Sequence, residues 1–236
     1  MVLTNPYLAL VLTFAIALAF LRLMDAIAQR GWLSSRMSRK WIHIGTGPLF
    51  VLCWLLFPPL PISRYLAALV PLLITAQFAL VGLGLWRDEA AVQAMSRSGD
   101  RRELLRGPLF YGLAFVALTV LFWKDSPIGI VALMFLCGGD GIADLLGRRL
   151  RSPRLPWNPQ KTAAGSFGVF LGGLALSLLI LAVYLHQGVF AGPMQAYAWP
   201  LLALGVVAVA VESLPVSEID NLTLPLVLSL IGYWVF

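Results

Sequence analysis

Gly138–Ser166, GGDGIADLLGRRLRSPRLPWNPQKTAAGS, is a polar stretch rich in Gly, Pro and Arg, and long apolar segments enclose it on both sides. A bilayer requires apolar runs of about 20 residues, because a helix rises about 1.5 Å per residue through roughly 30 Å of hydrocarbon. The stretch is therefore predicted to lie at a membrane edge between two spans. Its carboxylates, basic side chains and Lys-Thr pair are typical of a site where a phosphorylated, metal-bound substrate meets a lipid-embedded one.

The composition of the whole chain predicts a membrane protein. Of its 236 residues, 60% are hydrophobic and 12% are charged, about half the charged share of soluble domains. We expect an all-α fold, a polytopic transmembrane helical bundle forming one domain over residues 1–236, with the lipid bilayer as a partner. The net charge of +6 follows from membrane topology and attraction to anionic headgroups. Nothing in the chain suggests a nucleic-acid partner.

Eight apolar segments are predicted to span the membrane, although seven spans are an alternative. The fifth is too short to cross alone, and we expect a half-span that ends inside the membrane at Gly138-Gly139. Broken helices are tolerated there only beside a protein or water cavity, which places Asp140 near one. The predicted spans are Pro6–Leu23, Trp41–Phe57, Tyr65–Trp86, Pro108–Trp123, Ile128–Gly138, Phe167–Leu185, Tyr197–Val211 and Leu222–Phe236.

Basic residues predict the orientation of these spans. The segments 24–40, 87–107 and 139–165 are rich in Arg and Lys, whereas the alternate segments carry only Arg64 and Lys124. Cytoplasmic loops are enriched in Lys and Arg, so the basic segments are expected to face the cytoplasm or its organellar equivalent. The remaining segment on that face is acidic and contains Glu212, Glu218 and Asp220.

Asp140 and Asp144 form a candidate metal site. If a helix begins at the preceding glycines, the two side chains are four residues apart and face the same way. Mg²⁺ takes oxygen ligands and usually keeps nucleotide phosphates as partners. The alternative is an ordinary helix N-terminus, where acidic residues are favoured. An intramembrane carboxylate is costly and is functional by default, which favours the metal site for Asp140.

Basic and hydroxyl groups after Asp144 form a candidate phosphate site. Arg148, Arg149 and Lys161 are residue types that bind phosphate, although membrane orientation alone would also explain the two arginines. The spacing before Lys161-Thr162 excludes a Walker P-loop. A helix starting at Gly165-Ser166 would direct backbone N–H groups at an anion.

Further candidates lie elsewhere in the chain. His43 follows Arg39 and Lys40 inside an apolar run, where it could bind phosphate, move a proton or simply be a buried side chain bonded to a carbonyl. Glu103, taken alone, is a surface charge in a loop. The oxygens of Glu212, Asp220 and Asn221 could complete a cation site or hold a nucleotide sugar, or they could belong to a solvated loop. Cys53 and Cys137 lie in apolar segments and are expected to be buried, without a disulfide or zinc site.

Five motifs in order resemble the phytol kinases of plants and cyanobacteria. This family belongs to the wider polyprenol kinase group with dolichol kinase and the CTP-dependent diacylglycerol kinase, and residues 140–166 more distantly resemble the CDP-diacylglycerol synthases. The chain departs from the family at Ala163-Ala164 and at 151–154. The motifs are RKWIH at 39–43, ELLRGPL at 103–109, GGDGIAD at 138–144 with GRR at 147–149, LPWN at 155–158 with KT at 161–162 and GS at 165–166, and ESLP at 212–215 with DNLT at 220–223.

The resemblance implies an enzyme that transfers the γ-phosphoryl group of a nucleotide, typically CTP, to the hydroxyl of a long-chain isoprenoid alcohol. For phytol kinases this alcohol is phytol, and the product feeds tocopherol synthesis. The expected location is a cyanobacterial inner or thylakoid membrane, or a plastid membrane.

Residue roles follow as hypotheses. Asp140, Asp144 and Glu212 would hold Mg²⁺, and Asp140 or His43 would take the proton of the alcohol, a choice that stays open. Lys161 would neutralise phosphate oxygens. The rest of the nucleotide site is expected at Arg39, Lys40, Glu103, Arg148, Arg149, Asn158, Thr162, Ser166, Asp220 and Asn221.

Three other functions are weighed against this one. A phospholipid cytidylyltransferase would use the same metal and nucleotide site but release pyrophosphate. A kinase for another lipid alcohol, such as farnesol, geranylgeraniol, dolichol or diacylglycerol, would share the chemistry. A transporter for a small anion would need polar residues spread through several spans, whereas here they cluster on one face of the predicted topology.

Overall fold

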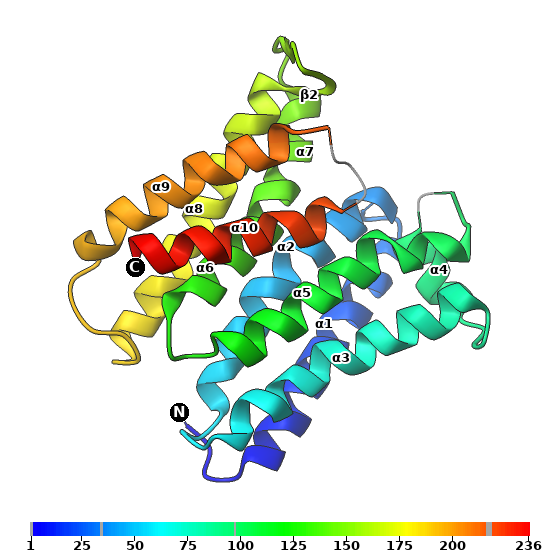
Figure 1. Cartoon of the computed structure of the whole chain (residues 1–236). Helices are drawn as coiled ribbons and strands as arrows, with labels where there is room; N and C mark the ends of the chain where they lie inside the picture. Colours follow the sequence, from blue (N-terminus) through cyan, green and yellow to red (C-terminus); the bar gives the residue numbers. More distant parts are fainter. Residues whose placement is uncertain (1, 34, 97, 216–218) are drawn as a thin grey trace. The chain divides into compact units, whose positions relative to one another are not determined.

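A computed structural model describes residues 2–33, 35–96, 98–215 and 219–236, and most of them are helical (Figure 1). Each of the eight predicted apolar segments is helical over most of its length, so the all-α prediction is confirmed. The chain divides into two compact units, Met1–Val120 and Leu121–Phe236, and each is described by itself.

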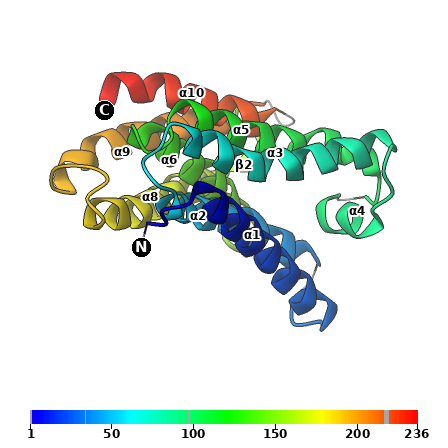
Figure 2. The same cartoon turned by 90° about the horizontal axis from the view of Figure 1, so that it is seen from below.

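The first unit is built from four long helices with short helical turns between them. α1 packs against α2 and α3, and α5 runs beside α3 in both views (Figures 1 and 2). Its core includes Trp54, Phe57 and Leu104, all fully buried. The elements are α1 (Pro6–Gln29), α2 (Ser35–Cys53), η1 (Trp54–Leu56), α3 (Ile62–Leu83), α4 (Glu89–Met95), η2 (Arg101–Leu105) and α5 (Gly107–Leu121).

Local sequence explains where these helices begin and end. The side chain of Asn5 accepts hydrogen bonds from the backbone N–H groups of Tyr7 and Leu8, and Pro6 takes the first helical position of α1, the residue types preferred at both places. α3 ends at Gly84, whose φ of +80° is the left-handed conformation that glycine adopts without strain. The apolar segments therefore begin and end by ordinary capping chemistry.

The second unit carries the polar stretch between its helices. α8 packs along α6 and α7 and against α9, and α10 lies beside α9 and α6 (Figure 1). Its core includes Phe135, Cys137 and Tyr184. The elements are α6 (Pro127–Met134), the π-helical turn η3 (Phe135–Gly139), α7 (Asp140–Arg149), β1 (Arg154–Leu155), β2 (Asn158–Thr162), α8 (Ala163–His186), α9 (Gln195–Ser213) and α10 (Asp220–Val235).

The predicted half-span is wrong, because the helix does not end at Gly138-Gly139. It continues from Pro127 through η3 to Arg149, a length of 23 residues. The glycines allow α8 to approach instead: a Cβ on Gly138 would lie 2.6 Å from the carbonyl oxygen of Gly172, and one on Gly172 would lie 2.2 Å from that of Gly138. Tertiary packing of the two backbones therefore overrides the low helix propensity of glycine.

The polar stretch itself contains regular structure, of which the sequence indicated the helix after the glycines but not the hairpin. α7 fills its first part, and an antiparallel hairpin follows, with Arg154 opposite Thr162 and Leu155 opposite Asn158. The hairpin leads directly into α8 (Figure 1).

Among the described residues, six helices are long and apolar enough to cross a membrane. The second and eighth predicted spans correspond to shorter apolar helices, Lys40–Leu56 and Asp220–Val235. Cys53 and Cys137 are buried and free of disulfides, as predicted.

Candidate functional site

The central contact of the candidate site is an ion pair between the hairpin and the end of α9. The Nζ of Lys161 donates to Oε1 of Glu212. The Glu212 side chain is only 7% exposed and that of Lys161 28% exposed, so the pair is largely removed from water. Fifty-one residues separate the partners in sequence, and neither motif by itself predicted their contact.

Two further carboxylates act on this pair. Asp140, at the start of α7, and Asp220, at the start of α10, both interact electrostatically with Lys161 and with Glu212. The structure thus brings together four residues that the sequence proposed separately: Asp140, Lys161, Glu212 and Asp220. Lys161 thus interacts with three carboxylates, which come from α7, α9 and α10.

The surroundings keep Lys161 charged. Burial alone would lower its pKa, but the opposing attraction of Glu212, with smaller contributions from Asp140 and Asp220, raises the pKa of Lys161 above its ordinary value of 10.5. The group is therefore an ammonium at neutral pH. A cation fixed beside carboxylates can bind a phosphate oxygen if one of those carboxylates is engaged by another cation.

Asp144 and Arg148 pair with each other on α7. Nε of Arg148 donates to Oδ1 of Asp144 at 2.7 Å, across one turn of the helix. The side chain of Arg148 is mostly exposed, and Arg149 is exposed beside it. The prediction that Asp140 and Asp144 lie on one helix, four residues apart, is confirmed. A role of Asp144 at Mg²⁺, or of Arg148 at phosphate, requires their contact to open.

Asn158 and Thr162 hold the hairpin in place. Nδ2 of the buried Asn158 donates to the carbonyl oxygens of Ser213 and Leu214, each at 3.2 Å, so it ties β2 to the end of α9. Oγ1 of Thr162 caps α8 by accepting from the N–H of Gly165 at 3.1 Å. These contacts give both side chains a structural task in positioning Lys161, which lies between them.

The start of α8 differs from the predicted anion site. The helix begins at Ala163, before Gly165-Ser166. The N–H of Ala163 donates to the carbonyl of Pro153, that of Ala164 to Oγ of Ser152, and that of Gly165 to Thr162. The backbone donors proposed for an anion at Gly165 are thus already used within the chain, while Ser166 lies half-buried in the first turn.

His43 lies in α2 of the first unit and is half-buried. Its ring centroid is 4.6 Å from that of Tyr111, and the Tyr111 hydroxyl donates to the His43 carbonyl oxygen at 3.0 Å. Lys40 lies one turn earlier and is also half-buried. Sequence reasoning missed Tyr111, although a tyrosine within an apolar segment just after Gly107-Pro108 is a signal that could have indicated it.

The remaining predicted residues have simpler surroundings. Oε1 of Glu103 accepts from the backbone N–H and from Oγ of Ser98, at 3.2 and 2.6 Å, so Glu103 organises the turn before α5. Oδ1 of Asp220 accepts from the N–H of Asn221 at 2.9 Å. The backbone of Arg39 belongs to α2, but its side chain and Glu218 lie outside the described residues.

The donor set fits a magnesium ion only together with a phosphate. Within the described ranges, no group of three or more His, Cys, Asp or Glu residues is close enough to hold a metal by itself. Mg²⁺ is usually bound by one or two carboxylates plus substrate phosphates, and Asp140 with Asp144 would supply carboxylate oxygens of that kind.

Known proteins similar to this chain are named as kinases of isoprenoid alcohols. The chain is 42% identical over 226 residues to probable phytol kinase 2, chloroplastic, of Oryza sativa subsp. japonica, which covers 95% of this chain and 74% of that protein. It is 37% identical to phytol kinase 1, chloroplastic, of Arabidopsis thaliana (94% and 73% covered). It is 38% identical to farnesol kinase, chloroplastic, of the same plant (95% and 73% covered). No family model and no solved structure matches the chain.

Proposed function

The chain belongs to the phytol kinase family, and we propose that it transfers the γ-phosphoryl group of CTP to the hydroxyl of a long-chain isoprenoid alcohol, phytol before others. It is an alcohol phosphotransferase. The observation that carries this conclusion is the identity of 37–42% with phytol and farnesol kinases along nearly the whole chain, which includes every element of the candidate site.

The cluster around Lys161 supports phosphoryl transfer. This reaction depends on positioning and on neutralising charge on the phosphoryl oxygens more than on covalent chemistry. Lys161, held as an ammonium between β2 and α9, binds a phosphate oxygen of the nucleotide. Asn158 and Thr162 position it through the contacts of the hairpin. In the second unit, the exposed Arg148 and Arg149, with Ser166, bind further phosphate oxygens, and Asp220 and Asn221 contact the rest of the nucleotide. For Arg39, Lys40 and Glu103 of the first unit, the proposed nucleotide role is supported by their sequence motifs.

Asp140, Asp144 and Glu212 are the residues that would hold Mg²⁺, and of the two aspartates Asp140 interacts with Glu212. When bound, the ion supplies positive charge to the triphosphate. The gathering of the Asp140, Glu212 and Asp220 carboxylates around Lys161 supports a role of Asp140 and Glu212 in this site. Asp140 or His43 accepts the proton of the attacking hydroxyl, since both are residue types suited to general-base catalysis.

The acceptor is an isoprenoid alcohol, but phytol is not its only candidate. The chain resembles a phytol kinase and a farnesol kinase of one plant almost equally, at 37% and 38% identity. Farnesol is therefore the second candidate substrate. Both alcohols carry a primary hydroxyl on a branched apolar chain, so the same phosphoryl chemistry serves either.

The expected topology has eight helices in the bilayer, including the shorter Lys40–Leu56 and Asp220–Val235, with the basic segments on the cytoplasmic or stromal face. The named relatives are chloroplastic, which supports a plastid or thylakoid-type membrane.

One experiment tests the activity directly. Purified protein in detergent is incubated with Mg²⁺ and CTP, UTP or ATP, and with phytol, farnesol, geranylgeraniol or diacylglycerol. We expect phytyl or farnesyl phosphate with release of CDP. Pyrophosphate in place of CDP would identify a cytidylyltransferase, and failure to phosphorylate any isoprenoid alcohol would contradict the proposal.

A further inference from the structure

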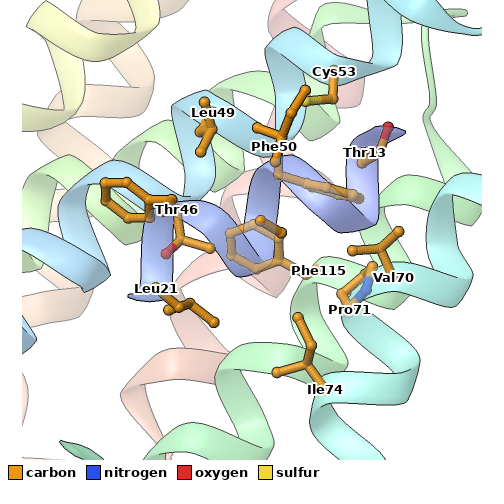
Figure 3. Close-up of a pocket in the computed structure, with 13 residues that line it drawn as sticks. Thr13, Leu21, Thr46, Leu49, Phe50, Cys53, Val70, Pro71, Ile74 and Phe115 are labelled. Carbon is orange, nitrogen blue, oxygen red and sulfur yellow. The ribbon is translucent and has the colours of Figure 1, made fainter. Parts of the chain in front are cut away.

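We propose that a pocket in the first unit holds one isoprene unit of the acceptor alcohol and thereby selects the shape of its chain. This inference rests on the proposed function, because it concerns the lipid substrate of the same reaction. The pocket is formed by α1, α2, α3 and α5 (Figure 3). None of its residues belongs to the sequence motifs or to the predicted site.

The lining is apolar almost throughout. Among the described residues that line it, Thr13 and Thr46 are the ones whose side chains carry oxygen (Figure 3). Oγ1 of Thr13 donates to the carbonyl of Ala9 at 2.7 Å, and Oγ1 of Thr46 donates to that of Ile42 at 2.6 Å. Both hydroxyls are thus engaged by their own helices. The pocket therefore offers methyl, methylene and aromatic surface, which suits a hydrocarbon and not a nucleotide.

The size of the pocket matches a short piece of chain. Its volume is about 50 Å³, well above the roughly 10–15 Å³ that one water molecule requires. A space of this size accommodates a small branched hydrocarbon group but not a long chain. The pocket therefore takes one isoprene unit, while the rest of the chain stays in lipid.

The pocket is linked to His43 through one face of α2 and through a series of ring contacts. Thr46 and Phe50 follow His43 on α2 at the spacing that keeps residues on one helix face. A chain of ring contacts also connects them: His43 lies 4.6 Å from Tyr111, Tyr111 lies 4.7 Å from Phe115, and Phe115 lies 5.8 Å from Phe50. Phe50 and Phe115 both line the pocket.

This arrangement predicts which part of the alcohol enters the pocket. At about 1.5 Å per residue, the α2 lining from Thr46 to Cys53 lies roughly 5–15 Å along the axis from His43. A hydroxyl near His43 would place the first isoprene unit before the pocket and a later unit inside it. Several lining side chains on α1 and α3, including Ile16, Ala17 and Ile74, are only half-buried. The pocket is therefore open to the outside of the first unit, where a lipid chain can enter.

Selection at this pocket must come from shape. Lipid tails are as apolar as the pocket, so transfer of the chain from bilayer to pocket gains little from the hydrophobic effect. Close packing of branched chain against the walls is what remains. A pocket of this kind is expected to change the ratio of kcat/KM for two alcohols by about 10-fold or more when one of them carries a methylene group that does not fit.

The test fills the pocket without touching the candidate catalytic residues. Ala17→Leu adds three carbons to the lining on α1. Ala15→Leu makes the same change on the same helix at an exposed position and is the matched control. The acceptors are prenol, geraniol, farnesol and geranylgeraniol, which lengthen by one isoprene unit at each step, and the quantity measured is kcat/KM for each alcohol.

We expect Ala17→Leu to lower the ratio of kcat/KM for geranylgeraniol over prenol by about 10-fold, and Ala15→Leu to leave that ratio unchanged. An unchanged ratio in Ala17→Leu, or an equal loss for every alcohol, overturns the inference. Phytol is assayed beside them, and if the wild-type protein phosphorylates neither phytol nor any of the four alcohols, the proposed function itself fails. If phytol is phosphorylated and the ratio is unchanged in Ala17→Leu, only the pocket inference fails.

A second measurement does not depend on activity or on a variant. Wild-type protein is irradiated with a farnesol analogue that carries a diazirine on a later isoprene unit, and the labelled peptides are sequenced. Labels on pocket residues of α1 or α2, lost when excess geranylgeraniol competes, support the site. Labels found only on exposed positions such as Ala15 contradict it.

Discussion

Replacing Lys161 by methionine should damage both the fold and the activity, and the two effects can be separated. The substitution leaves Glu212, 7% exposed, beside Asp140 and Asp220 without its ammonium partner. Breaking a buried ion pair from one side costs about 3–5 kcal/mol. Because Lys161 is 28% exposed, we expect about 3 kcal/mol, the lower end of that range. Arg154→Met removes an exposed cation from the same hairpin and should change stability by less than about 0.5 kcal/mol.

The effect on catalysis is a different quantity. If Lys161 binds a phosphate oxygen in the transition state, its loss should lower kcat by about 10²–10³-fold. The double variant Lys161→Met, Glu212→Gln replaces both charges by neutral groups and should recover most of the lost stability, because removing both partners of a buried pair is often nearly neutral.

Two quantities are measured for Lys161→Met, for Arg154→Met and for the double variant. They are the thermal unfolding temperature in detergent and the rate at which phytol is phosphorylated by CTP. We expect the double variant to be stable and inactive. Recovery of both stability and activity would show that Lys161 acts only through Glu212, and the phosphate role would be refuted. Full stability of Lys161→Met alone would refute the importance of the ion pair itself.

Three further predictions concern Asp140, Gly172 and the titration of Lys161. Asp140→Asn should reduce phosphorylation at least about 100-fold while the protein still inserts into membranes, as measured by turnover and membrane fractionation; wild-type turnover would contradict its role. Gly172→Ala should destabilise the second unit by about 1–3 kcal/mol, because the new Cβ would meet the Gly138 carbonyl oxygen at 2.2 Å; the exposed Ala175→Val is the control, and equal unfolding temperatures would refute the close approach of the helices. The pKa of Lys161 lies above its ordinary 10.5 in the folded protein, so its stabilisation is complete below that value and is lost as the pH rises through the folded pKa. The wild type should therefore lose thermal stability in strongly alkaline buffer that Lys161→Arg retains, and parallel curves for the two proteins would count against the ion pair.

The fold class followed from the sequence because it depends on local quantities. Apolar runs long enough for a bilayer, and caps such as Asn5 and Gly84, are properties of neighbouring residues. The same reasoning failed at Gly138-Gly139. Glycine disfavours helix in isolation, and nothing in the local sequence announced that Gly172 would pack against this pair and keep the helix continuous to Arg149.

The candidate site was recognised in parts. Acidic and basic residues at a membrane edge indicated Asp140, Lys161, Glu212 and Asp220 as chemical groups, and the order of the motifs indicated the enzyme family. The roles of Asn158 and Thr162 as supports of the hairpin were not foreseen, because their partners at Ser213, Leu214 and Gly165 depend on the hairpin itself.

By itself the sequence determined that this is a helical membrane protein and that one polar segment carries residue types that bind phosphate. It also determined the resemblance to kinases of isoprenoid alcohols. Hydropathy and the order of motifs are properties of the sequence and require no knowledge of distant contacts. Only the tertiary structure decided that Lys161 pairs with Glu212 across fifty-one residues, that two further carboxylates act on this pair, and that α1, α2, α3 and α5 leave an apolar pocket beside the ring contacts of His43. Charge interactions and cavities depend on distances in space, and these exist only once the helices have packed.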